Sequence, residues 1–307
     1  MTRKLAILFM AITWKVLPQG NPMVGQVQAA AQMRDYTTAE RMLTAMKAAE
    51  GMSPSSILAL SWMARGALVN KDYDRAEKYA SETRTEALAL LRRRQLDAEP
   101  ELPLALSAAI EVTAQAFAAR GRRSEAVAFL QQEIKTWHGT SMSLRLQKNL
   151  NLLNIEGKPA PPLDISHFVG PTRPVPLASL HGHPVLMFFW AHWCGDCKVQ
   201  VSLLQQLAQT FGPRGLILIG PTQHYGYAAG GLDATPAVET QWIEENRQKY
   251  YSRVGPMAVP VSSQNFLAYG ASSMPTFVLI DKQGIVRLYY PGKMTYDQLA
   301  QRIVKLL

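Results

Sequence analysis

The sequence predicts two domains, an all-α domain of helical hairpins followed by an α/β domain. Residues 24–156 are rich in alanine and poor in β-branched runs, a composition that favours helices. Residues 157–184 then hold seven prolines and show no helical period. Beyond them, short apolar runs alternate with helical stripes, as in folds whose helices pack on a mixed sheet. We therefore place the domains at 24–156 and 157–307.

Residues 1–23 have the character of a signal peptide. Arg3 and Lys4 precede the apolar run Leu5–Ile12, which is far shorter than the roughly 20 residues needed to cross a bilayer. No later segment is expected to span a membrane, so membrane contact is expected at most through this segment. We predict export, to the periplasm or an equivalent compartment. Lys15 lies unusually early for a signal peptide. The alternative is therefore a cytoplasmic protein whose first helix is amphipathic.

Three segments of the first domain share a turn followed by a helix. They are "RDYTTAERML" from Arg34, "KDYDRAEKYA" from Lys71 and "GRRSEAVAFL" from Gly121, and they align Ala39, Ala76 and Ala126. A small residue at this point lets two helices pack closely. The segments resemble tetratricopeptide repeats, which implies an array that binds a protein partner on its concave face. The alanines are spaced by 37 and 50 residues, so a plain helical bundle remains the alternative.

The second domain begins with a continuous apolar run, Val185–Trp190, which is typical of a strand buried on both faces. Alternating strand and helix signals follow it: a helix over 194–211, a strand over 216–220, a helix over 239–251, a hairpin of 277–280 with 285–290, and a last helix capped by Thr295 and Gln298.

The net charge of +9 would suit an anionic partner such as nucleic acid. However, the basic residues are scattered apart from those at 92–94, and no aromatic stripe accompanies them. We therefore expect no nucleic-acid binding.

The cysteines Cys194 and Cys197 follow the predicted strand and open the predicted helix. Unpaired backbone N–H groups and the helix dipole at such a position favour the thiolate, which is the nucleophile of disulfide exchange. A second cysteine one turn later can resolve a mixed disulfide. We therefore predict Cys194 as the nucleophile and Cys197 as the resolving, more buried partner.

Three other uses of these thiols are less consistent with the sequence. A zinc site would need four ligands, and His181, His183 and His192 lack a paired spacing. Two inert core thiols would not suit the polar Gly195-Asp196 between them. A peroxidatic cysteine would have threonine and proline at positions 191 and 187, which hold alanine and methionine. We expect no metal and no cofactor.

The segments "LHGHPVLMFFWAHWCGDC" and "SMPTFVLIDKQGIVRLYYPG" resemble the thioredoxin superfamily, specifically its TlpA-like thiol-disulfide oxidoreductases. The resemblance covers 157–307 and implies a thioredoxin-like fold with a redox-active disulfide, Cys194–Cys197. It also implies a cis Pro275 that faces the cysteines and presents the backbone of Met274 to a substrate chain. The active-site residues expected from it, besides the cysteines, are Trp193, Gly195, Asp196, Met274 and Pro275.

The chain departs from the thioredoxin pattern around the cysteines. Phe188 occupies the place of the buried acid that assists proton transfer in thioredoxin. His192 is the candidate proton relay, or it tunes the thiolate by its charge, or it is a surface histidine. Asp196 should raise the thiol pKa and make the couple less oxidising. The candidate substitute acids are Glu239, Glu244 and Glu245.

These features predict a thiol-disulfide oxidoreductase, of the protein-disulfide reductase type, that acts on protein clients and is reset by an upstream thiol donor. The alternative function is an interaction scaffold. In that case the helical array binds a partner, and the thioredoxin-like domain docks or senses redox state.

Overall fold

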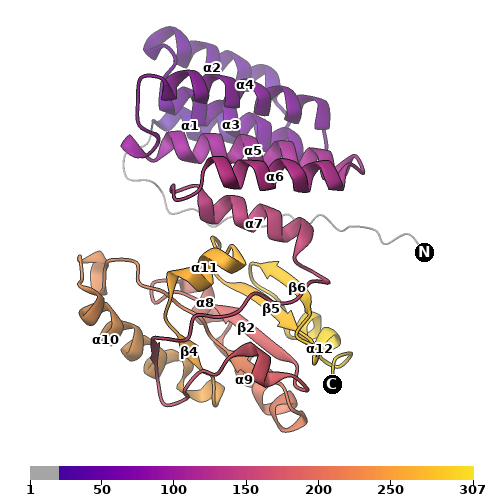
Figure 1. Cartoon of the computed structure of the whole chain (residues 1–307). Coiled ribbons are helices and arrows are strands. Elements are labelled where there is room, and N and C mark those ends of the chain that lie inside the picture. Colours follow the sequence, from indigo (N-terminus) through magenta and orange to yellow (C-terminus); the bar gives the residue numbers. More distant parts are fainter. Residues whose placement is uncertain (1–20) are drawn as a thin grey trace. The chain divides into compact units, whose positions relative to one another are not determined.

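The computed structural model describes residues 21–307 (Figure 1). The chain divides into two compact units, which meet in sequence between Asn149 and Leu150 and are described separately below. The signal-like segment predicted over residues 1–23 falls almost wholly outside the described residues.

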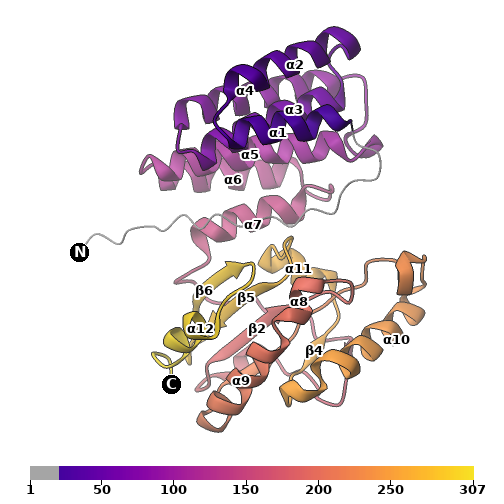
Figure 2. The same cartoon turned by 180° about the vertical axis from the view of Figure 1, so that it is seen from behind.

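The first unit is helical, as predicted. Its helices are α1 (Pro22–Gln32), α2 (Tyr36–Glu50), α3 (Pro54–Val69), α4 (Tyr73–Leu91), α5 (Glu101–Ala119), α6 (Arg123–Thr136) and the start of α7 (Ser143–Asn154). Figures 1 and 2 show consecutive helices lying side by side in antiparallel pairs, and α3 and α5 are the central members of the stack. The apolar faces of the helices are buried between these pairs.

The three repeated turns have the same geometry. Each places one residue in the left-handed region, at Arg34 (φ 65°), Lys71 (φ 60°) and Gly121 (φ 81°). The next backbone N–H then donates to the carbonyl five residues back, at 2.9 Å in all three turns. The aligned alanines, Ala39, Ala76 and Ala126, are fully buried. The sequence repeat therefore encodes three equivalent helical hairpins.

Gly66 of α3 lies against α1 at a point where there is no room for a side chain. A Cβ at this position would lie 2.8 Å from the Cβ of Ala31 and 2.9 Å from its backbone carbonyl. Real Cβ atoms do not approach this closely. The glycine therefore sets the distance between α1 and α3.

Helix α5 is the one helix among the described residues that is long and apolar enough to cross a membrane by length and composition. This differs from the expectation that no segment beyond the N-terminus has this character. Most of its apolar window, 61%, is buried inside the structure. It packs against α3, α4 and α6, so its hydropathy matches that of a central helix of the domain.

The second unit is built on a four-stranded mixed sheet of order β3-β2-β5-β6. The strands are β2 (Val185–Phe189), β3 (Ile217–Ile219), β5 (Thr276–Ile280) and β6 (Val286–Pro291). β2 pairs in parallel with β3 and antiparallel with β5, which forms the predicted hairpin with β6. A further small sheet joins β1 (Phe168–Val169) and β4 (Val259–Pro260), strands that are too short to have a sequence signal.

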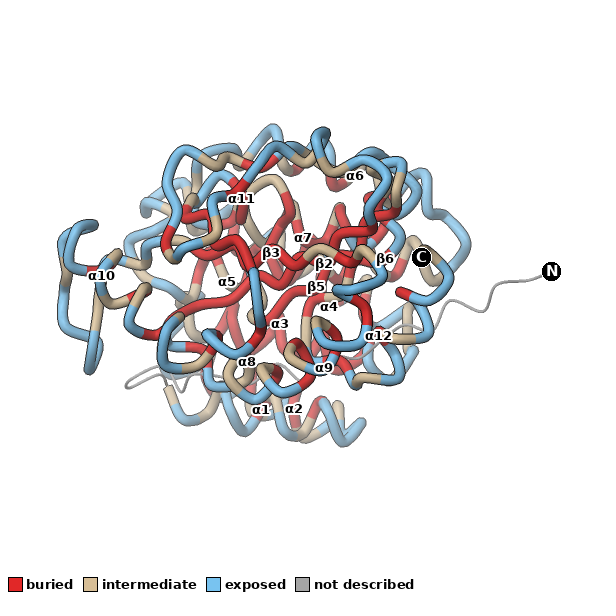
Figure 3. Tube along the Cα trace, turned by 90° about the horizontal axis from the view of Figure 1, so that it is seen from below, coloured by how far each residue is buried: buried red, intermediate tan, exposed pale blue. Residues whose placement is uncertain are grey.

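Helices cover both faces of this sheet: α8 (Gly195–Val199), α9 (Val201–Phe211), α10 (Pro236–Asn246), α11 (Ser263–Tyr269) and α12 (Tyr296–Ile303). Leu186 and Phe188 share a core cluster with residues of α9 and α12. Phe189 instead packs against the α11 rings of Phe266 and Tyr269, each at 5.3 Å between centroids. All of β2 is buried, as the red tube in Figure 3 shows, which confirms it as a central strand.

The single helix predicted over 194–211 is two helices that meet at Gln200. The Gln200 N–H donates to the Cys197 carbonyl three residues back, so the chain tightens at this point. The buried Gln200 side chain accepts a hydrogen bond from the Met294 N–H at 2.9 Å. The predicted cap of α12 is confirmed, with Thr295 and Gln298 exchanging both hydrogen bonds of a capping box.

Candidate active site

The two cysteines lie just beyond the buried end of β2. Cys194 is the N-cap of α8, and its sulfur accepts a hydrogen bond from the Cys197 N–H at 3.0 Å. The two form a disulfide with an S–S distance of 2.07 Å and a Cα–Cα distance of 5.3 Å. Cys194 is 3% exposed and Cys197 is fully buried. The pair is therefore positioned for dithiol-disulfide chemistry.

The peptide bond between Met274 and Pro275 is cis, as expected. Pro275 leads directly into β5, whose first residue, Thr276, pairs with Phe189 at the end of β2. This register brings the start of β5 to the sheet edge from which the cysteine segment emerges. The Met274 side chain packs against the same core cluster as both cysteines.

His192 is buried rather than on the surface, with 2% of its area exposed. Its Nε2 lies 3.0 Å from Oε1 of Glu239, a carboxylate on α10 with no exposed area. Glu239 also accepts hydrogen bonds from the backbone N–H groups of Tyr225 and Gly226, at 2.6 and 2.9 Å. Burial lowers the pKa of His192, although the Glu239 carboxylate acts in the opposite direction. The imidazole is therefore neutral near pH 7.

Aromatic rings enclose His192 and extend to the residue before the nucleophile. Tyr225 and Tyr227 meet the His192 ring edge to face, at 5.7 and 5.4 Å between centroids. Tyr225 also contacts the Trp193 ring at 5.4 Å. Trp193 is 40% exposed, so the aromatic cluster reaches the protein surface at the residue before Cys194. Nothing in the spacing of the loop that follows β3 pointed to this role for the two tyrosines.

The other candidate acids lie in different surroundings. Glu244 forms a two-pronged ion pair with Arg247 at 2.7 and 2.8 Å, and the exposed Glu245 interacts with Gln241. Only Glu239, of the three, contacts His192. From the sequence alone, the three acids could not be distinguished as candidates.

Phe188 fills the place of the missing acid with a ring. It is 1% exposed and packs against Phe277 at 5.1 Å and Tyr251 at 6.2 Å between centroids. A carboxylate at this position would be buried among rings without a partner, which is costly. The core at this point is thus apolar, and the buried acid beside His192, Glu239, lies on α10.

Asp196, between the cysteines, pairs with Lys293 at 3.0 Å. Its side chain keeps 27% of its area exposed, and that of Lys293 keeps 51%. An ion pair at this exposure is partly screened by water. The lysine therefore offsets some of the effect that the carboxylate has on the neighbouring thiols.

Within residues 21–307, no three His, Cys, Asp or Glu side chains gather in a way that could hold a metal ion. Two of the three candidate ligand histidines contact other groups. His183 Nδ1 lies 3.2 Å from the Gly215 carbonyl, and His192 pairs with Glu239.

The C-terminal domain is similar to known proteins. The model of the AhpC/TSA family matches residues 157–289. The chain is similar to the thiol:disulfide interchange protein DsbE of Pseudomonas aeruginosa, with 30% identity over 49% of this chain and 77% of that protein. It is 27% identical to the thiol-disulfide oxidoreductase ResA of Bacillus thuringiensis, over 49% of this chain and 78% of that protein.

Among solved structures, it is similar to a thiol:disulfide interchange protein of the thioredoxin family from Chlorobium tepidum. The identity is 20% and the TM-score 0.37, covering 48% of this chain and 95% of that chain. Through its C-terminal domain, with a Cys-x-x-Cys disulfide at the N-terminus of a helix, the chain belongs to the thioredoxin-like thiol-disulfide oxidoreductases, the family of ResA and DsbE.

Proposed function

We propose that the chain reduces disulfides of protein clients, with Cys194 as the nucleophile and Cys197 as the resolving cysteine. The Cys194 thiolate attacks one sulfur of a client disulfide, which forms a mixed disulfide and releases the other client sulfur as a thiolate. Cys197 then attacks Cys194, which releases the client dithiol and leaves the Cys194–Cys197 disulfide. Two electrons pass to the client, and an upstream thiol donor restores the dithiol.

The observation that carries this assignment is the position of Cys194 at the N-cap of α8. Its sulfur already accepts the Cys197 N–H at 3.0 Å, and such a hydrogen bond favours the charged form of a thiol. The fully buried Cys197 is less accessible to a large client. Both features support attack by Cys194 first.

His192 is the proposed proton relay, with Glu239 as its positioning residue. A carboxylate that already accepts two backbone N–H groups also accepts a proton-bearing Nε2, which leaves Nδ1 of the neutral ring as the proton acceptor. This pair would take the role of the acid that Phe188 replaces. A neutral imidazole supports a relay better than a fixed positive charge beside the thiolate.

The client contacts are assigned to the surface around the disulfide. Trp193 and the exposed Gly195 flank Cys194, and Asp196 lies between the cysteines. The backbone of Met274, before the cis Pro275, is the segment that would pair with the client chain. Apolar and backbone contacts of this kind suit an unfolded or loosely folded client.

The helical domain, with limits at 24–156, is proposed to bind a protein partner as a tetratricopeptide-like array. The three equivalent hairpin turns at Arg34, Lys71 and Gly121 support this assignment. We propose a periplasmic or otherwise exported protein, directed by the signal-like residues 1–23. A pure interaction scaffold is the second candidate function, and the buried, disulfide-forming cysteine pair argues against it.

The test is a Cys197→Ser variant in the full chain. We expect it to accumulate mixed disulfides through Cys194, seen as adducts that a reductant releases, and to lose insulin-reducing activity. Cys194→Ser should lose that activity and form no adducts. Wild-type protein without insulin-reducing activity, together with a Cys197→Ser variant that traps no protein, would refute the reductase.

A further inference from the structure

The helical domain contains a group of charged side chains in which positive charge exceeds negative charge. Arg65 of α3 and Lys148 of α7 are each 8% exposed. They surround Glu111 of α5 together with Arg145 of α7. Three basic side chains thus act on one carboxylate. Burial lowers the pKa of Lys148, but Arg65 and Arg145 alone outnumber the acid, so this cation cluster carries an excess of positive charge. Buried charge without a counter-charge is costly.

The pairing inside the cation cluster is loose. Arg65 Nη2 lies 3.4 Å from Glu111 Oε2, and Gln115 Nε2 lies 3.5 Å from the other carboxylate oxygen. By contrast, Arg84 and Glu133 in the same domain meet at 2.5 Å. The buried Nε of Arg65 has no hydrogen-bond partner, although its guanidinium stacks on Trp62 at 4.7 Å from the ring centroid. A donor of this kind is normally satisfied.

Glu111 does not relieve the imbalance by changing its charge. Burial alone would raise its pKa, but Lys148, Arg65 and Arg145 outweigh burial and lower the pKa of Glu111 to about 2. Burial lowers the pKa of Arg65 to about 10, so the guanidinium stays charged at neutral pH. The carboxylate and the guanidinium are both ionised, and the cations still outnumber the acid.

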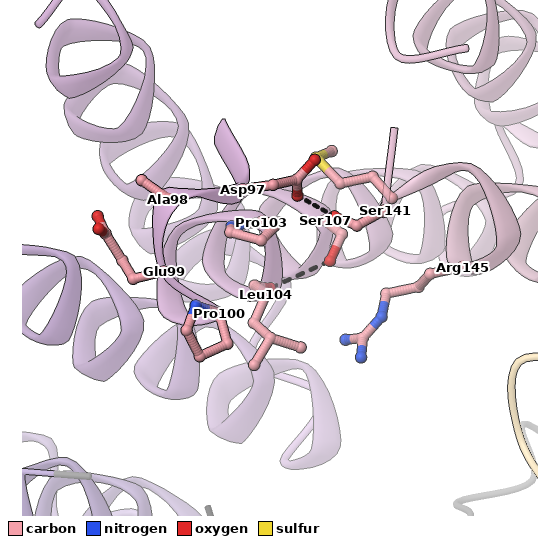
Figure 4. Close-up of a pocket in the computed structure, with 10 residues that line it drawn as sticks. Asp97, Ala98, Glu99, Pro100, Pro103, Leu104, Ser107, Ser141 and Arg145 are labelled. Carbon is pink, nitrogen blue, oxygen red and sulfur yellow. Dashed lines mark hydrogen bonds between the residues drawn. The ribbon is translucent and has the colours of Figure 1, made fainter. Parts of the chain in front are cut away.

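A pocket of about 430 Å³ opens beside the cation cluster, and Arg145 lines it (Figure 4). Its lining is largely apolar and includes Pro100, Pro103, Leu104 and Met142. In Figure 4 the Arg145 guanidinium extends toward the side where Leu104 lies, away from the hydrogen-bonded pair of Asp97 and Ser141.

The acids at the pocket already have partners. Glu99 pairs with Arg94 at 2.9 Å, and Asp97 accepts the hydrogen bond from Ser141. Arg145 has no ion-pair partner within the part of the chain that the structure describes, and it adds to the positive potential from Arg65 and Lys148. The pocket therefore offers an apolar floor next to a cation whose acid, Glu111, is shared with Arg65 and Lys148.

We propose that this pocket binds a peptide segment that carries a carboxylate next to an aliphatic side chain. The carboxylate would lie against Arg145, at the edge of the cation cluster, and the aliphatic side chain would cover Leu104 and the neighbouring prolines. The carboxylate is either a C-terminus or an aspartate or glutamate side chain. The site lies in the helical domain and does not depend on the proposed redox function.

The test measures binding of three labelled hexapeptides to the full chain by fluorescence anisotropy. Each peptide is alanine-based and contains one leucine. The first has an aspartate and a free C-terminus, the second the same aspartate and a C-terminal amide, and the third an asparagine and a free C-terminus. We expect the first to bind, and the loss of the recognised carboxylate to weaken binding about tenfold or more. The second and third peptides show which carboxylate is recognised.

Arg145→Gln should weaken binding of the first peptide about tenfold, while Arg41→Gln, the same charge change on the exposed face of α2, should leave it unchanged. Leu104→Asp, which places a like charge on the pocket floor, should also abolish binding. Thermal melting checks the fold of each variant, and insulin reduction should be unaltered in all of them. Absence of binding by all three peptides, or equal loss in Arg41→Gln, would overturn the proposal.

Discussion

Replacing Glu239 by glutamine should destabilise the C-terminal domain by about 3 kcal/mol. The carboxylate has no exposed area and accepts three hydrogen bonds, from His192, Tyr225 and Gly226. Glutamine has nearly the same size, but one of its two oxygens becomes an NH2 donor. At least one of the three donors then faces another donor in a buried site.

The magnitude follows from two contributions. Losing a hydrogen bond to a charged acceptor costs about 1.5–3 kcal/mol, and a buried donor left without a partner costs about 1–3 kcal/mol. The lower ends of the two ranges sum to about 2.5 kcal/mol, which places the expected loss near 3 kcal/mol. Relaxation of the loop that carries Tyr225 would reduce the loss toward the lower values.

The assay is urea unfolding of the oxidised protein at pH 7, followed by tryptophan fluorescence, with Glu245→Gln as the matched control. Glu245 lies on the same helix but is exposed, so its replacement should change the stability by less than about 0.5 kcal/mol. A Glu239→Gln variant as stable as this control would refute the reasoning, because the buried carboxylate would then not hold His192 and the loop in place.

Three further predictions concern other parts of the chain. The unfolding free energy should fall as the pH drops below about 6.5, by at most about 1.4 kcal/mol per pH unit, because His192 takes up a proton more readily in the unfolded chain than in its buried native site. His192→Gln should flatten this dependence, as measured by urea titrations at pH 7.5 and 5.5. Asp196→Asn should lower the thiol pKa and raise the reduction potential. The rise should be less than about 30 mV because the carboxylate is partly screened and paired with Lys293, and an unchanged potential in glutathione equilibration would contradict this. Gly66→Ala should lower the free energy of unfolding in urea by about 1–3 kcal/mol, whereas Gly25→Ala, at an open helical position, should raise it by up to about 1 kcal/mol. Equal effects of the two substitutions would contradict the close approach of α1 and α3.

Local patterns in the sequence predicted most of the C-terminal fold. The run Val185–Phe189 is a central strand because a segment buried on both faces needs no polar alternation. The helix cap at Thr295 was equally predictable, because a capping box involves only residues that are three apart in the chain. The repeated turns likewise depend on contacts within one hairpin. The aligned alanines were therefore sufficient to predict where each turn lies.

The break at Gln200 shows where such patterns fail. The stripe of apolar residues continues across it, so periodicity predicts one helix. The interruption is accompanied by a hydrogen bond from Met294, which is 94 residues away in the chain. No local signal can report a partner at that distance.

The residues that carry the chemistry divide in the same way. The Cys194–Cys197 pair was predictable, since a strand, a helix start and a short motif identify it, whereas cis Pro275 was expected only from the resemblance to the thioredoxin superfamily. The partner of His192 was not, because Glu239 is one of three acids in one segment and differs from the others only in being buried. The cation cluster is a further case, since its members come from three helices. Sequence specifies interactions between near neighbours, whereas the packing of distant segments determines which charged groups leave water and which of them meet.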